Sequence, residues 1–490
     1  MSRRATRTPT MTRRLAIVVV LAVALVAAVA LDRTAPEPTA ARPAAALEGG
    51  PTIPDASALS VSWYCAEGTS APDGRADETV MLANLGREEA EAVVSVFPGG
   101  DDEPTSERVS VPPLGQVSVA VSDVLEVPES LQPDTTFAGP GVVVEVFGGQ
   151  VVVEHSVVRG DDLALGPCAR QPSPNWYFAA GTTARGVEHV IALFNPFGED
   201  AVVDLSFLTD TGFQAPDSTQ GVVVPRRSRV AVPLHEHVRR QERVAVAVEA
   251  RTGRVVAEQS VVSDGSEIPA GIALSLGATA PASRWALPAG LRVDGGTERV
   301  VLANFDRAGS EAEVSTLLPG EAEPLTPETA AVPGRTVVPV GAGANLGVGG
   351  EYGVEVNVTG PEPLVVEELM EWTAPADPVG LALEVGMPRP APAWAFAGAA
   401  VDGEATIAVL NPGARPVTVE LLAYTSGDLD SPPSAPARVV EPGRRATFLL
   451  SEIGVDPDQV ILVQADGEVF VQRELVTATG RSLDAGIPEP

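Results

Sequence analysis

The stretch Trp176–Asn195, WYFAAGTTARGVEHVIALFN, carries the pattern that decides the fold of this chain. A tryptophan opens it, Gly181 follows five residues later, and an apolar run ends at Asn195. Four copies occur, with steps of 113, 109 and 109 residues between their tryptophans. A period near 110 residues is that of a whole domain, far longer than a propeller blade or a solenoid turn. The landmark residues of the four copies are Trp63, Trp176, Trp285 and Trp394, followed by Asn84, Asn195, Asn304 and Asn411.

Apolar side chains alternate with a period of two around each asparagine, which is typical of strands with one buried face. The positions four and two residues before the asparagine are apolar in every copy: Val80 and Leu82, Ile191 and Leu193, Val300 and Leu302, Ile407 and Val409. A slip of one residue would turn this face outward, so the shared register predicts the same packing in all four copies.

A recurring proline and a closing hairpin complete each copy. The prolines, each between two short Val-rich runs, are Pro112, Pro225, Pro333 and Pro442. The hairpin turns are predicted at Gly148-Gly149, Thr252-Gly253, Thr359-Gly360 and Asp466-Gly467. About seven short strands in roughly 100 residues are typical of an immunoglobulin-like sandwich. The predicted fold class is therefore all-β, with four tandem immunoglobulin-like β-sandwich modules after a single N-terminal transmembrane or signal helix.

The repeats set the domain boundaries, and a chain of 490 residues is too long for one core. We predict an N-terminal signal anchor at 1–31, a Pro/Ala-rich linker at 32–54, and modules at 55–170, 171–281, 282–390 and 391–490. Short Pro-rich joints between the modules favour extended connections, which predicts a semi-rigid rod.

The N-terminal segment indicates export. Five arginines precede or flank the apolar run Leu15–Leu31, which is 17 residues long and contains no charge. Such a run is near the shortest helix that spans a bilayer, and the positive-inside rule places the remainder outside the cytoplasm. Ala28-Val29-Ala30 is a candidate cleavage site, so the chain is predicted to be a single-pass membrane protein, or secreted if the signal is cleaved. The net charge of −32 argues against a nucleic-acid partner.

The two cysteines, Cys65 and Cys168, both lie in the predicted exported part. An oxidising compartment lets a disulfide persist, so we predict that they are bonded. Free thiols or a metal pair are the alternatives.

Few residues offer catalytic or metal-binding chemistry. The four histidines are His155, His189, His235 and His237. His235 and His237 would share a face of an extended strand, but two ligands without a third are a weak metal signal. Asp101-Asp102, Asp161-Asp162 and Asp428-Leu429-Asp430 are interpreted as solvated turns, with calcium binding as the alternative. We predict no catalytic, metal-binding or cofactor-binding residues and no enzyme activity.

The closing strand of each copy carries two columns of polar residues. The first column contains Glu154, Glu258, Glu367 and Gln472, and the second contains His155, Gln259, Glu368 and Arg473. Nothing singles out the second carboxylate that glycoside hydrolysis requires. We therefore predict a structural role, such as accepting backbone hydrogen bonds or lying on the wet face. The tryptophans are interpreted as core anchors and the asparagines as loop caps, with glycan stacking on tryptophan as the alternative.

The Arg-flanked anchor, the Trp63-Tyr64-Cys65 opening and the lysine-free, Ala/Val/Gly-rich repeats resemble a family of exported actinobacterial proteins with a large domain of unknown function. The resemblance covers most of the chain from Asp55 onward and implies a cell-wall role. We expect a non-catalytic extracytoplasmic structural or interaction protein of the cell envelope, anchored in the membrane and with an envelope protein or glycan as its partner. The alternative is an array of carbohydrate-binding modules, which would need aromatic side chains on an exposed face.

Overall fold

The computed structural model describes residues 50–490, except 71–74, 101, 126–138, 321–324, 400, 402 and 425–435. The predicted signal anchor and most of the linker lie outside these residues. Within the described ranges, no helix combines the length and apolar character needed to cross a bilayer.

The first repeat consists of two antiparallel sheets with the strand orders β1-β6-β3-β4 and β5-β2-β7-β8. Side chains from both sheets, among them Trp63, Val80, Val94 and Val153, belong to one hydrophobic cluster. The alternating apolar face predicted around Asn84 therefore packs against the tryptophan strand of the other sheet. The strands are β1 (Val61–Cys65), β2 (Asp77–Asn84), β3 (Ala90–Phe97), β4 (Thr105–Val111), β5 (Gly115–Ala120), β6 (Gly141–Phe147), β7 (Val151–Arg159) and β8 (Asp162–Pro167), with the one-turn helix α2 (Val121–Val124) after β5.

The same pairing order recurs in the other three repeats. In the second and third, the sheets are β9-β15-β11 with β12 and β13, β14-β10-β16-β17, β18-β23-β20-β21 and β22-β19-β24-β25. In the last repeat, β31 serves both sheets, because it pairs with β26 and β28 in one and with β27 and β32 in the other.

The strands of the second repeat are β9 (Asn175–Phe178), β10 (Val187–Asn195), β11 (Ala201–Thr209), β12 (Gly212–Gln214), β13 (Val222–Val224), β14 (Ser228–Pro233), β15 (Val244–Thr252), β16 (Val256–Ser263) and β17 (Gly271–Leu276), with helix α3 (Leu234–His237). Those of the third are β18 (Arg284–Leu291), β19 (Gly296–Asn304), β20 (Ser310–Leu317), β21 (Glu328–Val332), β22 (Thr336–Gly341), β23 (Glu351–Val358), β24 (Val365–Trp372) and β25 (Gly380–Val385). Those of the fourth are β26 (Ala391–Phe396), β27 (Glu404–Asn411), β28 (Val417–Tyr424), β29 (Arg438–Val440), β30 (Arg444–Leu449), β31 (Val460–Val476), β32 (Arg481–Ala485) and β33 (Ile487–Pro488). Single 3₁₀ turns cover Asp217–Thr219 and Leu450–Ile453.

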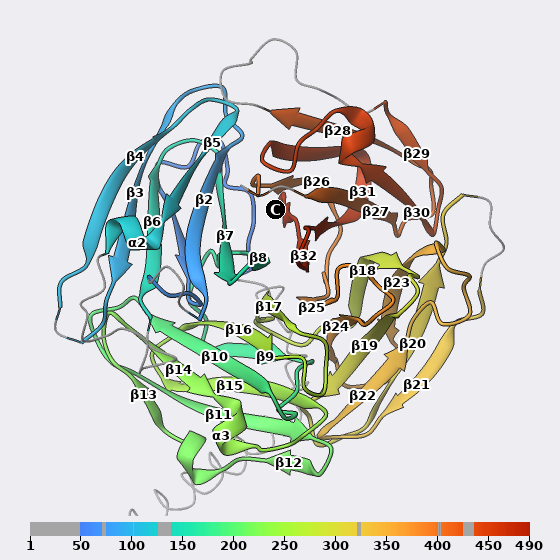
Figure 1. Cartoon of the computed structure of the whole chain (residues 1–490), viewed down its shortest axis with the longest axis horizontal. Coiled ribbons are helices and arrows are strands. Elements are labelled where there is room, and N and C mark those ends of the chain that lie inside the picture. Colours follow the sequence, from blue (N-terminus) through green and yellow to red (C-terminus); the bar gives the residue numbers. More distant parts are fainter. Residues whose placement is uncertain are drawn as a thin grey trace, which may run out of the picture. The chain divides into compact units, whose positions relative to one another are not determined.

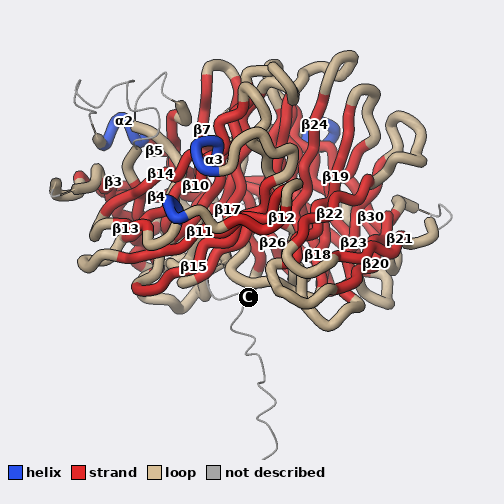
Figure 2. The backbone as a smooth tube through the Cα atoms, turned by 90° about the horizontal axis from the view of Figure 1, so that it is seen from below, coloured by secondary structure: helices blue, strands red, loops and turns tan. Residues whose placement is uncertain are grey.

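The all-β prediction is confirmed, and strands make up nearly all of the regular structure (Figure 2). The immunoglobulin-like arrangement is not confirmed, because that fold places the first, second, fourth and fifth strands in one sheet. Here the first strand shares a sheet with the sixth, third and fourth. The predicted closing hairpin is wrong, since β6 and β7 lie in different sheets and the turn at Gly148-Gly149 crosses between the layers.

The landmark residues have the predicted structural roles. All four tryptophans are fully buried. Each asparagine donates from Nδ2 to two backbone carbonyls and accepts at Oδ1 from the amide two residues later; Asn304, for example, binds Ala308 O at 2.9 Å and Val332 O at 3.0 Å. Loop capping by this residue is therefore confirmed in every copy.

The repeats form a closed ring instead of the predicted rod. The edge strands that follow the closing strands, β8, β17, β25 and β32, meet near the centre of Figure 1, where β8 contacts β17 and β32, and β25 contacts the same two strands. The first and last repeats are also joined, for instance by the 2.8 Å hydrogen bond from Ile53 N to Pro488 O. Leu47–Pro490 accordingly forms one compact unit. The prediction of a rod was wrong because it rested only on the Pro-rich joints between the repeats. The closing strands bury both of their faces, and this burial brings neighbouring repeats together. The domain boundaries themselves stay predictions.

Candidate functional site

The first polar column of the closing strands joins neighbouring repeats. Glu258 Oε2 on β16 accepts hydrogen bonds from the amides of Ala66, at 2.9 Å, and Glu67, at 2.6 Å. These amides follow Trp63 by three and four residues, in the preceding repeat. Glu367 and Gln472 do the same one and two repeats later, with Ala179 and Ala180 and with Ala289 as their donors. The prediction that this column accepts backbone hydrogen bonds is confirmed, although the bonds run between repeats.

The fourth junction closes the ring with charges. Arg473 donates from Nη2 to Glu154 Oε2 at 2.8 Å, from Nε to Asp484 Oδ1 at 2.9 Å, and from Nη1 to the carbonyl of Ala397 at 2.6 Å. Burial raises the pKa of Glu154 to about 8, and Arg473 only partly offsets this effect. A backbone hydrogen bond from Ala397, three residues after Trp394, also lowers the pKa of Glu154, and this bond repeats the geometry of the other junctions.

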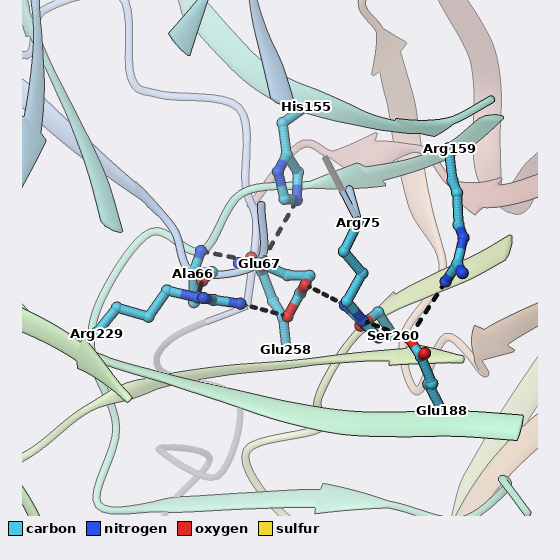
Figure 3. Close-up of polar contacts among 9 residues, drawn as sticks. All are labelled: Ala66, Glu67, Arg75, His155, Arg159, Glu188, Arg229, Glu258 and Ser260. Atoms are coloured by element: carbon cyan, nitrogen blue, oxygen red, sulfur yellow. Dashed lines mark hydrogen bonds and ion pairs between the residues drawn. The ribbon is translucent and has the colours of Figure 1, made fainter. Parts of the chain in front are cut away.

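The junction between the first and second repeats holds a group of buried charges (Figure 3). Glu67 lies between two guanidinium groups, with Arg75 Nη1 at 2.9 Å and Arg229 Nη2 at 2.8 Å. Burial would raise the pKa of Glu67, but Arg229 and Arg75 outweigh it and hold that pKa below its usual value. Arg229 also donates to the carbonyl of Ala66 at 2.5 Å, which ties β14 to the segment after the first tryptophan strand.

His155 lies between two carboxyl groups of this junction. Its Nδ1 is 3.1 Å from Glu78 Oε1, and its Nε2 is 3.5 Å from Glu258 Oε2. Burial would lower the pKa of His155, but the charge of Glu258 and the hydrogen bond and charge of Glu78 raise it to about 9. Burial likewise raises the pKa of Glu258 to about 7, against the opposing effect of His155. The imidazole is therefore protonated at neutral pH and compensates the buried acids.

The edge of this network reaches partly exposed residues. Arg75 also donates from Nη2 to Ser260 Oγ at 2.9 Å, and its Nε is 3.3 Å from Glu188 Oε2. Arg159 approaches the same carboxylate at 3.2 Å from the solvent side (Figure 3). Exposed ion pairs contribute little to stability, so the buried contacts define this junction.

At the second junction, the neutral Gln259 occupies the column position that His155 has at the first. Gln259 donates from Nε2 to Glu367 Oε1 at 2.5 Å and accepts at Oε1 from His189 Nε2 at 3.0 Å. Ser275 Oγ adds a bond of 3.0 Å to Glu367 Oε1. Burial lowers the pKa of His189 to about 4 and raises that of Glu367 to about 7. The residues of the second polar column therefore make different contacts in different repeats, whereas those of the first column accept hydrogen bonds across the junctions.

A glycine in the repeated phrase makes room for these polar groups. A Cβ atom on Gly68 would lie 2.3 Å from Glu78 Oε2, and one on Gly181 would lie 2.2 Å from His189 Cε1. Both side chains occupy the position six residues before the repeated asparagine. The glycine five residues after the tryptophan therefore allows a buried polar side chain to reach the junction.

The disulfide between Cys65 and Cys168 is present as predicted. The two sulfur atoms and His155 form the one group of three metal-ligand residue types found close together in the described part of the chain, with ligand atoms within 4.8 Å of one another. Disulfide sulfurs are not thiolates, and thiolates are what bind a metal ion. His155 instead bridges carboxyl groups.

The remaining candidates are not part of these polar clusters. His235 and His237 lie on helix α3, not on a strand as their interpretation assumed, and His237 Nδ1 is 2.9 Å from Ser218 Oγ. Asp162 accepts backbone hydrogen bonds from Leu163 and Ile272, so it is not a solvated turn residue. Asp101, Asp428 and Asp430 lie outside the described residues.

Sequence reasoning missed Glu78 and the arginines Arg75 and Arg229. Glu78 lies six residues before Asn84, on the same strand face as the apolar residues four and two before it. This alternation was a signal that the acid is buried. Arg75 and Arg229 are not part of the repeat, and only the fold brings them to Glu67.

Comparison with known proteins gives one family match. A family model described as a family of unknown function, DUF5719, matches residues 140–384, which is half of the chain. The search of curated proteins gave no match. Among solved structures, the crystal structure of Thermotoga maritima 1070 is similar at 12% identity, covering 22% of this chain and 94% of that chain with a TM-score of 0.20.

Proposed function

The chain belongs to the DUF5719 family of unknown function, and we propose that it is a non-catalytic structural or interaction protein that presents four β-sandwich modules, held in a ring, from the membrane into the cell envelope. One observation carries the proposal. At each junction a buried side chain of one repeat binds the segment after the tryptophan strand of another, and the last repeat is bound to the first.

These junctions support a structural role because their buried polar groups hydrogen-bond to one another across the repeats. Glu67, Glu258 and Glu367 are fully buried and hydrogen-bonded across repeats. Carboxylates placed in this way fix the orientation of neighbouring sandwiches and are out of reach of a substrate. The outer faces of the sheets remain for partners.

Export is supported by the sequence and by the disulfide. Leu15–Leu31 has the composition of a membrane-anchoring segment, with arginines before it. The Cys65–Cys168 disulfide fits an oxidising compartment. We propose envelope proteins or cell-wall glycan as partners. The alternative of a glycan-binding array with the repeated tryptophans as stacking platforms has lost its support, because all four are buried.

Co-sedimentation tests the proposed role. The purified full chain would be mixed with isolated cell-envelope fractions and, as a control, with cytosolic fractions of equal protein content. We expect saturable binding to the envelope fraction, and we expect the Arg473→Leu variant, which opens the fourth junction, to bind more weakly. Equal recovery with both fractions would contradict the proposal. In intact cells, protease added outside should cleave residues beyond the anchor; full protection would contradict the proposed location.

A further inference from the structure

The third repeat contains a cavity of about 280 Å³. Residues from β18, β19, β23 and β24 line it, together with the segment after β22. Tyr352, Met370 and Trp372 contribute apolar walls, and Arg292 and Glu298 contribute polar groups. At about 30 Å³ per water molecule, this space corresponds to roughly nine waters, which suits a small organic molecule.

The two aromatic residues of the cavity are specific to this repeat. Tyr352 lies four residues before Val356, the strand partner of Trp285, and Trp372 lies five residues after Glu367. The corresponding residues in the first, second and fourth repeats are Pro140, Val244 and Gln459 for Tyr352, and Arg159, Ser263 and Thr477 for Trp372. The cavity is therefore not a by-product of the shared architecture.

Glu298 lines this cavity and is 8% exposed. The Tyr352 hydroxyl donates to its Oε2, while its Oε1 has no hydrogen-bond partner among the described residues. A buried carboxyl oxygen without a donor costs free energy, and a ligand that donates to it would recover that cost. Burial raises the pKa of Glu298 to about 7, partly offset by Tyr352 and Arg445, so a bound cation would favour its ionised form.

The cations near Glu298 are engaged by other groups. Arg299 pairs with Glu371, Arg481 pairs with Glu474, and Arg445 pairs with Glu351. Arg292 donates from Nη1 to the backbone carbonyls of Val293 and Gly296. In the described part of the chain, no ion pair within 4 Å includes Glu298, and the only cation that lowers its pKa is the more distant Arg445.

We propose that this cavity binds a small primary ammonium compound with an apolar body, whose ammonium group donates to Glu298 and whose body lies against Tyr352 and Trp372. A carboxylate beside aromatic rings, in a space of this size, is complementary to such a cation. Arg481, 4.9 Å from the Trp372 ring, is neutralised by Glu474 and approaches that ring from the neighbouring fourth repeat. This site is independent of the proposed envelope role.

Calorimetry with two probes of matched size tests the proposal on the full chain: benzylammonium and benzyl alcohol. We expect saturable binding of benzylammonium, at least ten times tighter than that of the alcohol. Equal binding of both probes, or binding of neither, would overturn the proposal. This comparison needs no variant, so it holds even if a substitution disturbs folding.

Two variants then locate the site. Glu298→Gln should weaken benzylammonium binding at least tenfold and leave any binding of the alcohol unchanged. Glu313→Gln removes the same charge from an exposed position on β20 that does not line the cavity, and it should bind benzylammonium like the original chain. An equal loss in both variants would show that general surface charge, and not Glu298, attracts the probe.

Discussion

Glu78 and Glu298 occupy the same position in two repeats, six residues before the repeated asparagine, yet they have opposite surroundings. Glu78 contacts His155 and fits against Gly68, within the junction of the first two repeats. Glu298 contacts a tyrosine hydroxyl and lines a cavity, with no cation paired to it in the described structure. One fold thus accommodates a buried acid in two ways: Glu78 is paired with a histidine at a junction between repeats, and Glu298 lines a cavity without an ion pair.

The largest expected effect on stability comes from removing the imidazolium of His155, the cation that contacts Glu78. The His155→Leu variant leaves Glu78 and Glu258 buried without their cation. Breaking a buried ion pair costs about 3 to 5 kcal/mol of stability. We expect a loss of that size in the free energy of unfolding, measured with urea at pH 7.5. A loss below about 1 kcal/mol would show that the two acids are relieved in another way.

The pH dependence of stability should have a predictable sign. The pKa of His155 is about 9 in the folded chain against an ordinary value of 6.5, so the folded state holds this proton more tightly. The stabilisation is complete below pH 6.5 and is lost as the pH rises through 9, about 3 kcal/mol in all. Glu154, with a pKa of about 8, acts in the same direction.

Other groups allow this pH test to be checked. His189, whose pKa is about 4, opposes the trend only below pH 6.5. Urea unfolding at intervals from pH 6.5 to 9 should therefore show a falling free energy of unfolding, and His155→Leu should flatten the fall. A free energy that rises over this range would contradict the assignment of a protonated imidazole.

Gly68→Ala should have an intermediate effect. The added methyl group would overlap the Glu78 side chain, and overpacking a buried site costs about 1 to 3 kcal/mol. Gly198→Ala is the matched control, because a Cβ atom there meets nothing within 4 Å. Thermal unfolding of both variants measures the difference; equal melting temperatures would mean that the junction accommodates the methyl group freely.

The smallest effect on stability should come from Glu298→Gln. This change removes a buried acid that has no cation partner, so the free energy of unfolding should change by less than about 1 kcal/mol. Urea unfolding beside His155→Leu measures the contrast directly. A loss in the free energy of unfolding as large as that of His155→Leu would contradict the proposed difference between Glu78 and Glu298.

The sequence predicted the parts of this molecule that depend on local pattern. The register around the four asparagines, the burial of the tryptophans and the disulfide follow from spacing and periodicity, and the structure has them all. Ring closure could not be read in this way, because it depends on complementary surfaces between repeats. Glu258, for example, is polar in sequence, and only its donors Ala66 and Glu67 explain why it is buried.

The candidate sites were predicted less completely for the same reason. His155 was singled out as one of four histidines, but its two acidic neighbours come from different strands and repeats. Tyr352 and Trp372 fall outside the 110-residue period, so they carried no repeat signal. Departures from the repeat are therefore the useful clue to such residues.

The hydrogen bond from Ile53 to Pro488 brings the two ends of the ring together. A short peptide could therefore link these ends, and the chain could be opened at a joint such as residues 281–283 to give a circular permutant with the same junctions. In the natural order, any group attached after Pro490 would emerge next to the point where the chain enters the first sandwich.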